Sequence, residues 1–123
     1  MKLHASGPSG VNTITGYGEG YVMVNGERRS SSLVVLPDRV EEWSAARFDT
    51  LTAEDFAFLK DLGVEIVLLG TGARQRFPHP RLTSALAQSG IGLEVMDVQA
   101  ACRTYNILVA EERKVAAALL IEK

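Results

Sequence analysis

The segment Val64-Glu65-Ile66-Val67-Leu68-Leu69 constrains the fold of this chain more than any other part of the sequence. It is almost continuously apolar, and a strand of this kind is buried on both faces, as in a parallel or mixed sheet covered by helices. Helical patterns on either side of it supply such a cover. The segment therefore predicts a layered α/β domain built around this strand.

The order of elements after residue 51 supports this prediction. Helices are expected from Thr52 to Gly63, from Pro80 to Gly90 and over 98–109. Three strands alternate with them: one over 64–69, a second that ends at Asp97, and a third over 115–121. Thr52 is suited to cap the first helix and Gly63 to end it. Strands separated by helices need crossover connections, which are right-handed where the strands are parallel.

The N-terminal part carries strand signals instead. Asn25-Gly26 is a strong two-residue hairpin signal, because a type I′ turn needs positive φ at both positions. Tyr21-Val22-Met23-Val24 forms one expected arm, and residues 28–36 form the other, which Pro37 ends. Residues 38–51 are expected to be irregular.

The ends of the domain follow from composition. Residues 1–11 are rich in Gly, Ser and Pro, so we expect a flexible N-terminus there and a single α/β domain over 12–123. Within the irregular stretch before residue 52, Trp43 and Phe48 are expected to anchor the chain over the core.

Charge and cysteine content exclude several classes of function. The chain has 123 residues, a net charge of −2 and one cysteine. No extended basic surface is expected, so nucleic acid is not a predicted partner. A single cysteine indicates a reducing compartment, and the two histidines are too far apart for a zinc motif. No segment has the length of a signal peptide or a membrane span. We therefore expect a bacterial cytoplasmic protein with no metal, no cofactor and no membrane insertion.

The candidate site is Gly70-Thr71-Gly72-Ala73-Arg74-Gln75-Arg76, just beyond the end of the central strand. Open α/β sheets bind ligands at that edge, and glycines with arginines suit an anion. The segment lacks the third glycine of a dinucleotide fingerprint, and no Walker Gly-Lys-Ser/Thr follows. A turn with special φ values and a solvated basic loop is the favoured alternative.

Other residues have structural explanations that compete with functional ones. Asp97 ends a strand at the same edge and can serve as a functional carboxylate, although capping the next helix is favoured. Asn106 faces away from the apolar stripe, where it can bond a neighbouring backbone or face a partner. Cys102 lies on that stripe, so a core position is favoured over a reactive thiol. No catalytic or metal-ligand motif stands out.

The order of several segments resembles a widespread family of small domains of unknown function. The matching segments are Ile14-Thr15-Gly16-Tyr17-Gly18, Gly20-Tyr21-Val22, Leu68-Leu69-Gly70-Thr71-Gly72, Asp97, Cys102-Arg103-Thr104-Tyr105-Asn106-Ile107-Leu108, and Val115-Ala116-Ala117-Ala118-Leu119-Leu120. The family includes a mitochondrial complex I assembly factor and a human protein associated with adipogenesis. The resemblance implies a three-layer α/β fold with a central mixed, largely parallel sheet and an N-terminal β-meander. It also implies a role through protein contacts, with no established catalytic activity.

One turn departs from the family pattern. Where the family usually has Glu-Gly-Arg before the last strand, this chain has Glu111-Glu112-Arg113. A positive φ at Glu112 would strain that turn by roughly 1 kcal/mol relative to glycine.

Three functions remain open from the sequence. The first is a non-enzymatic interaction or assembly factor that meets a protein partner through the 70–79 loop, with Arg74, Arg76 and Phe77 prominent. The second is a small-ligand or anion-binding domain, of which an enzyme is one form, with its site at Gly70-Thr71-Gly72 beside Asp97. The third is a redox sensor, which requires an exposed Cys102 thiol with a lowered pKa.

Overall fold

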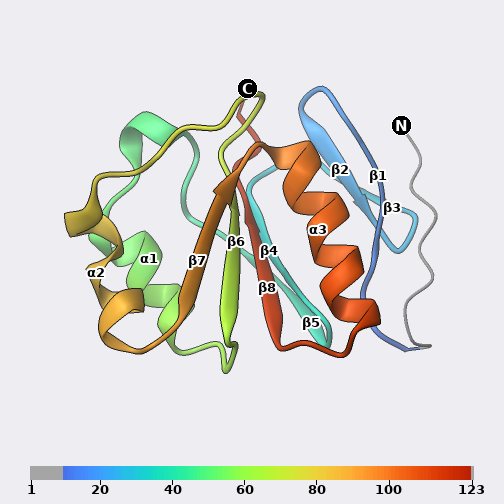
Figure 1. The fold of residues 1–123 in the computed structure, drawn as a ribbon. Helices are drawn as coiled ribbons and strands as arrows, with labels where there is room; N and C mark the ends of the chain where they lie inside the picture. The colour runs from blue at the N-terminus through green and yellow to red at the C-terminus, as the bar shows by residue number, and fades with distance from the viewer. Residues whose placement is uncertain (1–9, 123) are drawn as a thin grey trace.

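The computed structural model describes residues 10–122 and has three layers (Figure 1). A five-stranded sheet in strand order β5-β4-β8-β6-β7 forms the middle layer. Helices α1 (Ala53–Lys60) and α2 (Pro80–Gln88) cover one face, while α3 (Val98–Ala110) and a small second sheet cover the other. The predicted flexible N-terminus over 1–11 lies almost entirely outside the described residues.

The central sheet is mixed, as predicted. Strands β8 (Val115–Leu119), β6 (Ile66–Gly70) and β7 (Gly92–Met96) pair in parallel, in that order. Strand β4 (Leu33–Leu36) pairs antiparallel with β8 on one side and with β5 (Arg39–Glu42) on the other. The three parallel strands alternate with α2 and α3 along the chain, which is the crossover arrangement that parallel pairing requires.

The small sheet is an antiparallel meander of β1 (Ile14–Gly18), β2 (Tyr21–Val24) and β3 (Glu27–Arg29). Its second turn is the predicted Asn25-Gly26 hairpin, in which φ is 52° at Asn25 and 81° at Gly26. Positive φ at both positions is what a type I′ turn needs. The local sequence signal was therefore sufficient to place this hairpin.

The predicted second arm over 28–36 was wrong in its extent. The arm ends at Arg29, and the chain then leaves the meander, so that residues 33–36 enter the central sheet as β4. All four residues of β4 are buried, and a strand buried on both faces fits a central position better than a hairpin arm. Three serines at 30–32 separate the two strands.

The stretch over 38–51 is also more regular than predicted. It contains β5 at the sheet edge and the short 3₁₀ helix η1 (Phe48–Thr50). The sequence of β5, Arg-Val-Glu-Glu, has little apolar character, because charged residues protect an edge strand from pairing with other chains. The predicted anchor Trp43 is confirmed, since it is buried and its indole N–H donates to the Asp55 carbonyl at 3.1 Å.

Each face of the central sheet has its own apolar core. Leu68, Val35 and Ala117 point toward α3 and the meander, while Val67 and Leu69 point toward α1 and α2. This alternation explains why the strand around residues 66–69 is apolar without interruption, as the sequence indicated.

Cys102 belongs to the core on the α3 side. Its side chain is fully buried, and burial raises the pKa of the thiol to about 12. A thiol in these surroundings is neutral and sheltered from solvent. The structural interpretation of Cys102 is confirmed, and the redox sensor lacks the exposed thiol it requires.

Candidate interaction site at the end of strand β6

The loop that follows β6 contains most of the residues singled out from the sequence. It runs from Thr71 to His79 and crosses the end of the sheet where β6, β7 and β8 finish, before α2 begins at Pro80 (Figure 1). We call residues 71–79 the β6–α2 loop. Two crossover connections leave this edge, one through the loop to α2 and one from β7 directly into α3.

Hydrogen bonds close the gap between the ends of β6 and β7. The backbone N–H of Thr71 donates to the Met96 carbonyl, and the N–H of Val98 donates to the Gly72 carbonyl, each at 2.9 Å. In open α/β sheets, ligands bind in a crevice at such a point. Here the backbone groups that line the crevice bond to each other.

Thr71 is fully buried and organises the loop from within. Its hydroxyl donates to the Arg74 carbonyl at 2.7 Å and accepts the N–H of Arg76 at 2.9 Å. These two bonds fold the loop back onto its own start. Thr71 is therefore an internal part of the loop, with its hydroxyl directed away from solvent.

Gly70 and Gly72 are required by close packing. A Cβ atom at Gly70 would lie 3.1 Å from the Val98 Cα and 3.2 Å from the Ala101 Cβ, so the missing side chain lets α3 approach β6. Gly72 has a φ of 92°, and a Cβ there would lie 2.8 Å from a carboxylate oxygen of Glu122. Close packing therefore explains why glycine occupies both positions.

The Arg76 side chain links the loop to the C-terminal end of the chain. Its Nε donates to the Thr71 carbonyl at 3.1 Å, and its Nη2 donates to the Glu122 carboxylate at 2.6 Å. The guanidinium also lies over the Phe48 ring, 4.7 Å from its centroid. Glu122 in turn accepts the N–H of Phe48 at 2.7 Å. The charge of Arg76 is therefore matched within the protein.

Glu122 is a neighbour of the candidate site that sequence reasoning missed. Burial alone would raise the pKa of its carboxyl, but the hydrogen bonds from Phe48 and Arg76 outweigh burial and lower this pKa below its usual range. No motif marks a glutamate that follows the last strand. Only the fold, which brings residue 122 next to residue 76, shows that they form a pair.

Phe77 and Arg74 face solvent, as do Ala73, Gln75 and His79 of the same loop. Phe77 is 71% exposed, the largest fraction among the large hydrophobic residues that the structure describes as exposed. Before it, the Gln75 side-chain amide donates to the Val95 carbonyl and the backbone N–H of Arg76 donates to the Thr71 hydroxyl, each at 2.9 Å. After it, the His79 Nδ1 accepts the N–H of Arg81 at 3.1 Å and caps α2. The exposed ring therefore lies between a hydrogen-bonded position of the loop and the start of a helix.

Asp97 and Asn106 occupy different places relative to this loop. Asp97 is adjacent to it and caps α3, accepting the N–H of Ala100 at 2.8 Å. Asn106 is about 13 Å further along the helix axis, at 1.5 Å per residue. Its amide accepts the N–H of Ile14 at 2.9 Å and donates to the Ile14 carbonyl at 2.7 Å, which ties the meander to α3.

A groove of about 650 Å³ borders the loop on the side of the meander. Gly72 and Ala73 form one wall, and the β1–β2 turn at Gly18–Tyr21 forms the opposite wall. The charged residues that line it are Glu19 and Glu122. The free arginines expected at an anion site are therefore replaced here by carboxylates.

Neither a metal cluster nor a membrane-spanning helix is found in the described part of the chain. Within residues 10–122, no three His, Cys, Asp or Glu side chains are grouped so as to hold a metal ion. No helix in the same range has the length and apolar character needed to cross a bilayer.

Solved structures define the class of fold. A crystal structure of a protein from Bordetella parapertussis is 42% identical and superposes with a TM-score of 0.86, covering 93% of this chain and 99% of that one. A solution structure from Bordetella pertussis, described as a Mth938-like domain, is 37% identical with a TM-score of 0.79, covering 98% of this chain and 92% of that one. These likenesses confirm the predicted α/β fold.

The chain belongs to the family described as "Protein of unknown function (DUF498/DUF598)", which it matches over residues 14–120. The family predicted from the sequence is thereby confirmed. A curated relative from Bos taurus, named NADH dehydrogenase (ubiquinone) 1 alpha subcomplex assembly factor 3, is 35% identical over 109 residues, covering 87% of this chain and 59% of the relative. The chain thus spans between about half and three-fifths of the assembly-factor relatives it matches.

Proposed function

We propose that this protein is a non-enzymatic interaction factor of the assembly type, which binds a protein partner through the β6–α2 loop. The observation that carries the proposal is the exposed Phe77 ring, which follows Arg76, whose backbone N–H donates to the buried Thr71 hydroxyl. Arg74, also exposed, supplies a positive charge on the same loop. The expected partner surface is an apolar pocket with a carboxylate at its rim.

Physical considerations favour Phe77 as a contact. Aromatic and arginine side chains dominate the binding energy of many interfaces, especially when a rigid backbone presents them. The internal bonds of Thr71 and Arg76 order the loop before any partner arrives, so less conformational entropy is lost on binding. This gives Arg76 a positioning role and leaves Phe77 and Arg74 as the contacts.

The relatives support the same kind of role. The curated mammalian relatives bear the name of an assembly factor, and the match covers 87% of this chain and 59% of the bovine and human relatives. From the relatives we carry over to this chain only a role that depends on contact with another protein. The buried, unpaired cysteine agrees with a reducing compartment such as the cytoplasm.

A matched pair of variants tests this function. A photo-crosslinking residue is placed at position 77 or at position 107, because Ile107 is also an exposed large hydrophobic, 58% accessible, but lies on α3 outside the loop. We expect a specific crosslinked protein from position 77 alone. With that partner in hand, Phe77→Ala should weaken binding about tenfold or more, whereas Ile107→Ala should not. Equal binding by both variants would reject the loop as the contact.

The groove beside Gly72 favours a second candidate function, the binding of a small ligand. Its volume of about 650 Å³ lies within the usual range of ligand pockets. Of its two charged residues, Glu122 is already paired with Arg76, and Glu19 suits a cationic or hydroxyl-bearing ligand better than an anion. A thermal-shift screen of cationic and neutral metabolites tests this function, and a shift that Glu19→Gln abolishes would support it.

A further inference from the structure

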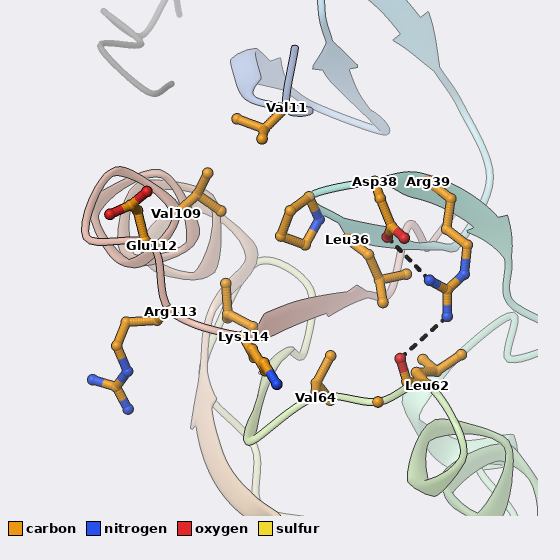
Figure 2. Close-up of a pocket in the computed structure, with 13 residues that line it drawn as sticks. Val11, Leu36, Asp38, Arg39, Leu62, Val64, Val109, Glu112, Arg113 and Lys114 are labelled. Atoms are coloured by element: carbon orange, nitrogen blue, oxygen red, sulfur yellow. Dashed lines mark hydrogen bonds and ion pairs between the residues drawn. The ribbon is translucent and has the colours of Figure 1, made fainter. Parts of the chain in front are cut away.

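A second cavity, of about 380 Å³, lies at the other end of the central sheet, where β8 begins (Figure 2). It is remote from the β6–α2 loop, which crosses the end where β8 finishes. Its walls come from segments far apart in the sequence and are mainly apolar: Val11, Leu36, Pro37, Val64, Val109 and Val115. Its size and apolar character are those of a small-molecule pocket.

Hydrogen bonds between these segments hold the walls in place. The Asn12 side-chain amide donates to the Leu36 carbonyl, and the Asn12 N–H donates to the Pro37 carbonyl, each at 2.9 Å. On the opposite side, the Arg39 guanidinium donates to the Leu62 carbonyl at 3.2 Å. The cavity is therefore formed in advance, and a ligand need not order its walls.

The turn between α3 and β8 forms a third wall. Glu112 adopts a φ of 60°, and its N–H donates to the Val109 carbonyl at 2.9 Å. The Lys114 carbonyl accepts the N–H of Glu65 at 2.8 Å, which joins this turn to the start of β6. Lys114 thus projects from a backbone that is fixed on both sides.

Among the described residues that line the cavity, one cation has no charged partner within residues 10–122. Asp38 and Arg39 pair with each other at 3.0 Å, and Figure 2 shows Glu112 and Arg113 pointing away from the hollow. Lys114 lies between Arg113 and Val64 in the same view. Its ammonium has no hydrogen bond or ion pair with any residue that the structure describes. An apolar cavity with a free ammonium beside it is complementary to an amphipathic anion.

We propose that this cavity binds a small amphipathic carboxylic acid, with its hydrocarbon part among the valines and its carboxylate on Lys114. A carboxylate suits the site because Lys114 supplies up to three donors and no acceptor. The hydrocarbon part gains from leaving water, at about 25 cal/mol for each Å² of apolar surface buried. This site is independent of the β6–α2 loop and of any protein partner.

Octanoate is the probe, and octanamide is its uncharged match. Each is titrated into ¹⁵N-labelled protein while amide shifts are recorded. We expect octanoate to move the amides of Val64, Lys114 and Val115 in a saturable way, and octanamide to bind about tenfold more weakly. Equal binding of the two probes would overturn the assignment to a carboxylate. Failure of both to shift these amides would overturn the site itself.

Lysine variants separate this site from general attraction to a surface charge. Lys114→Met keeps much of the side-chain stem but removes the ammonium, and should weaken octanoate binding about tenfold while leaving octanamide unchanged. Lys60→Met removes a half-exposed lysine on α1 outside the cavity and should change neither. Lys114→Arg should restore most of the binding. Unchanged octanoate affinity in Lys114→Met would contradict the proposal.

Discussion

The two ends of the central sheet contrast with each other. At the end where β6 finishes, the sequence has a glycine-rich segment typical of ligand sites, yet Thr71, Gly72, Met96 and Val98 bond to one another and close the gap between β6 and β7. The groove of about 650 Å³ at this end lies to one side of that gap, toward the meander. At the end where β8 begins, the sequence has no motif, yet the structure contains an open apolar cavity, beside which the Lys114 ammonium pairs with none of the described residues.

The contrast shows that glycines and cavities have different origins. The glycines of the closed end are needed where a helix and a carboxylate approach the backbone closely. The cavity arises where segments distant in sequence meet without filling the space between them. A glycine-rich segment therefore marks close packing here, and the open site must be found from the fold.

The largest expected effect comes from the residue that ties the meander, and with it one cavity wall, to α3. Asn106→Leu would leave the N–H and carbonyl of the buried Ile14 without partners, which should cost about 2–4 kcal/mol of unfolding free energy. Urea unfolding monitored by circular dichroism measures this. Gln99→Leu, at an exposed site on the same helix, is the control and should change stability by less than about 0.5 kcal/mol.

The next effect tests the closed end. Gly70→Ala would place a methyl group 3.0 Å from Leu119 and 3.1 Å from the Val98 backbone, so overpacking should cost about 1–3 kcal/mol. Gly92→Ala is its match on the neighbouring strand, because its nearest contact would be an ordinary 3.7 Å. If the two variants unfold at the same urea concentration, Gly70 is not required by packing.

A smaller effect of opposite sign is expected at the wall of the open end. Glu112 has a φ of 60°, the conformation whose strain was considered from the sequence, and glycine adopts it without strain. Glu112→Gly should therefore stabilise the protein by up to about 0.5 kcal/mol, after allowing for the greater freedom of glycine in the unfolded chain. The melting temperature should rise, and a fall would show that the Glu112 side chain contributes more than its strain costs.

The smallest effect concerns pH at the closed end. Hydrogen bonds from Phe48 and Arg76 lower the pKa of Glu122 in the folded protein, despite the opposing effect of burial. The resulting stabilisation is present above the unfolded pKa and is lost as pH falls through the lower folded value. Glu122→Gln should thus be less stable than the parent at pH 7, with the difference shrinking below about pH 4. A difference that does not vary with pH would exclude this linkage.

Local signals predicted what depends on neighbouring residues. The Asn25-Gly26 turn and the Thr52 and Asp97 helix caps follow from side-chain and backbone chemistry within a few positions. These features need no knowledge of the rest of the fold. The apolar stripe of α3 likewise placed Cys102 in the core.

Contacts between distant segments were beyond the reach of the sequence. The entry of residues 33–36 into the central sheet depends on pairing with β8, more than eighty residues later in the chain. The ion pair between Arg76 and Glu122 joins two residues that no local pattern connects. For the same reason the sequence offered Arg76 as a surface contact, whereas its guanidinium is engaged inside the protein.

The most direct test of the proposed interaction loop is its backbone order, measured by ¹⁵N relaxation of the amides over residues 73–77. A loop held by Thr71 and by the Arg76–Glu122 pair should give order parameters near 0.85, as in the strands, and Arg76→Ala should lower them below about 0.6. Order parameters below about 0.6 in the unmodified protein would contradict a loop that presents Phe77 on a fixed backbone.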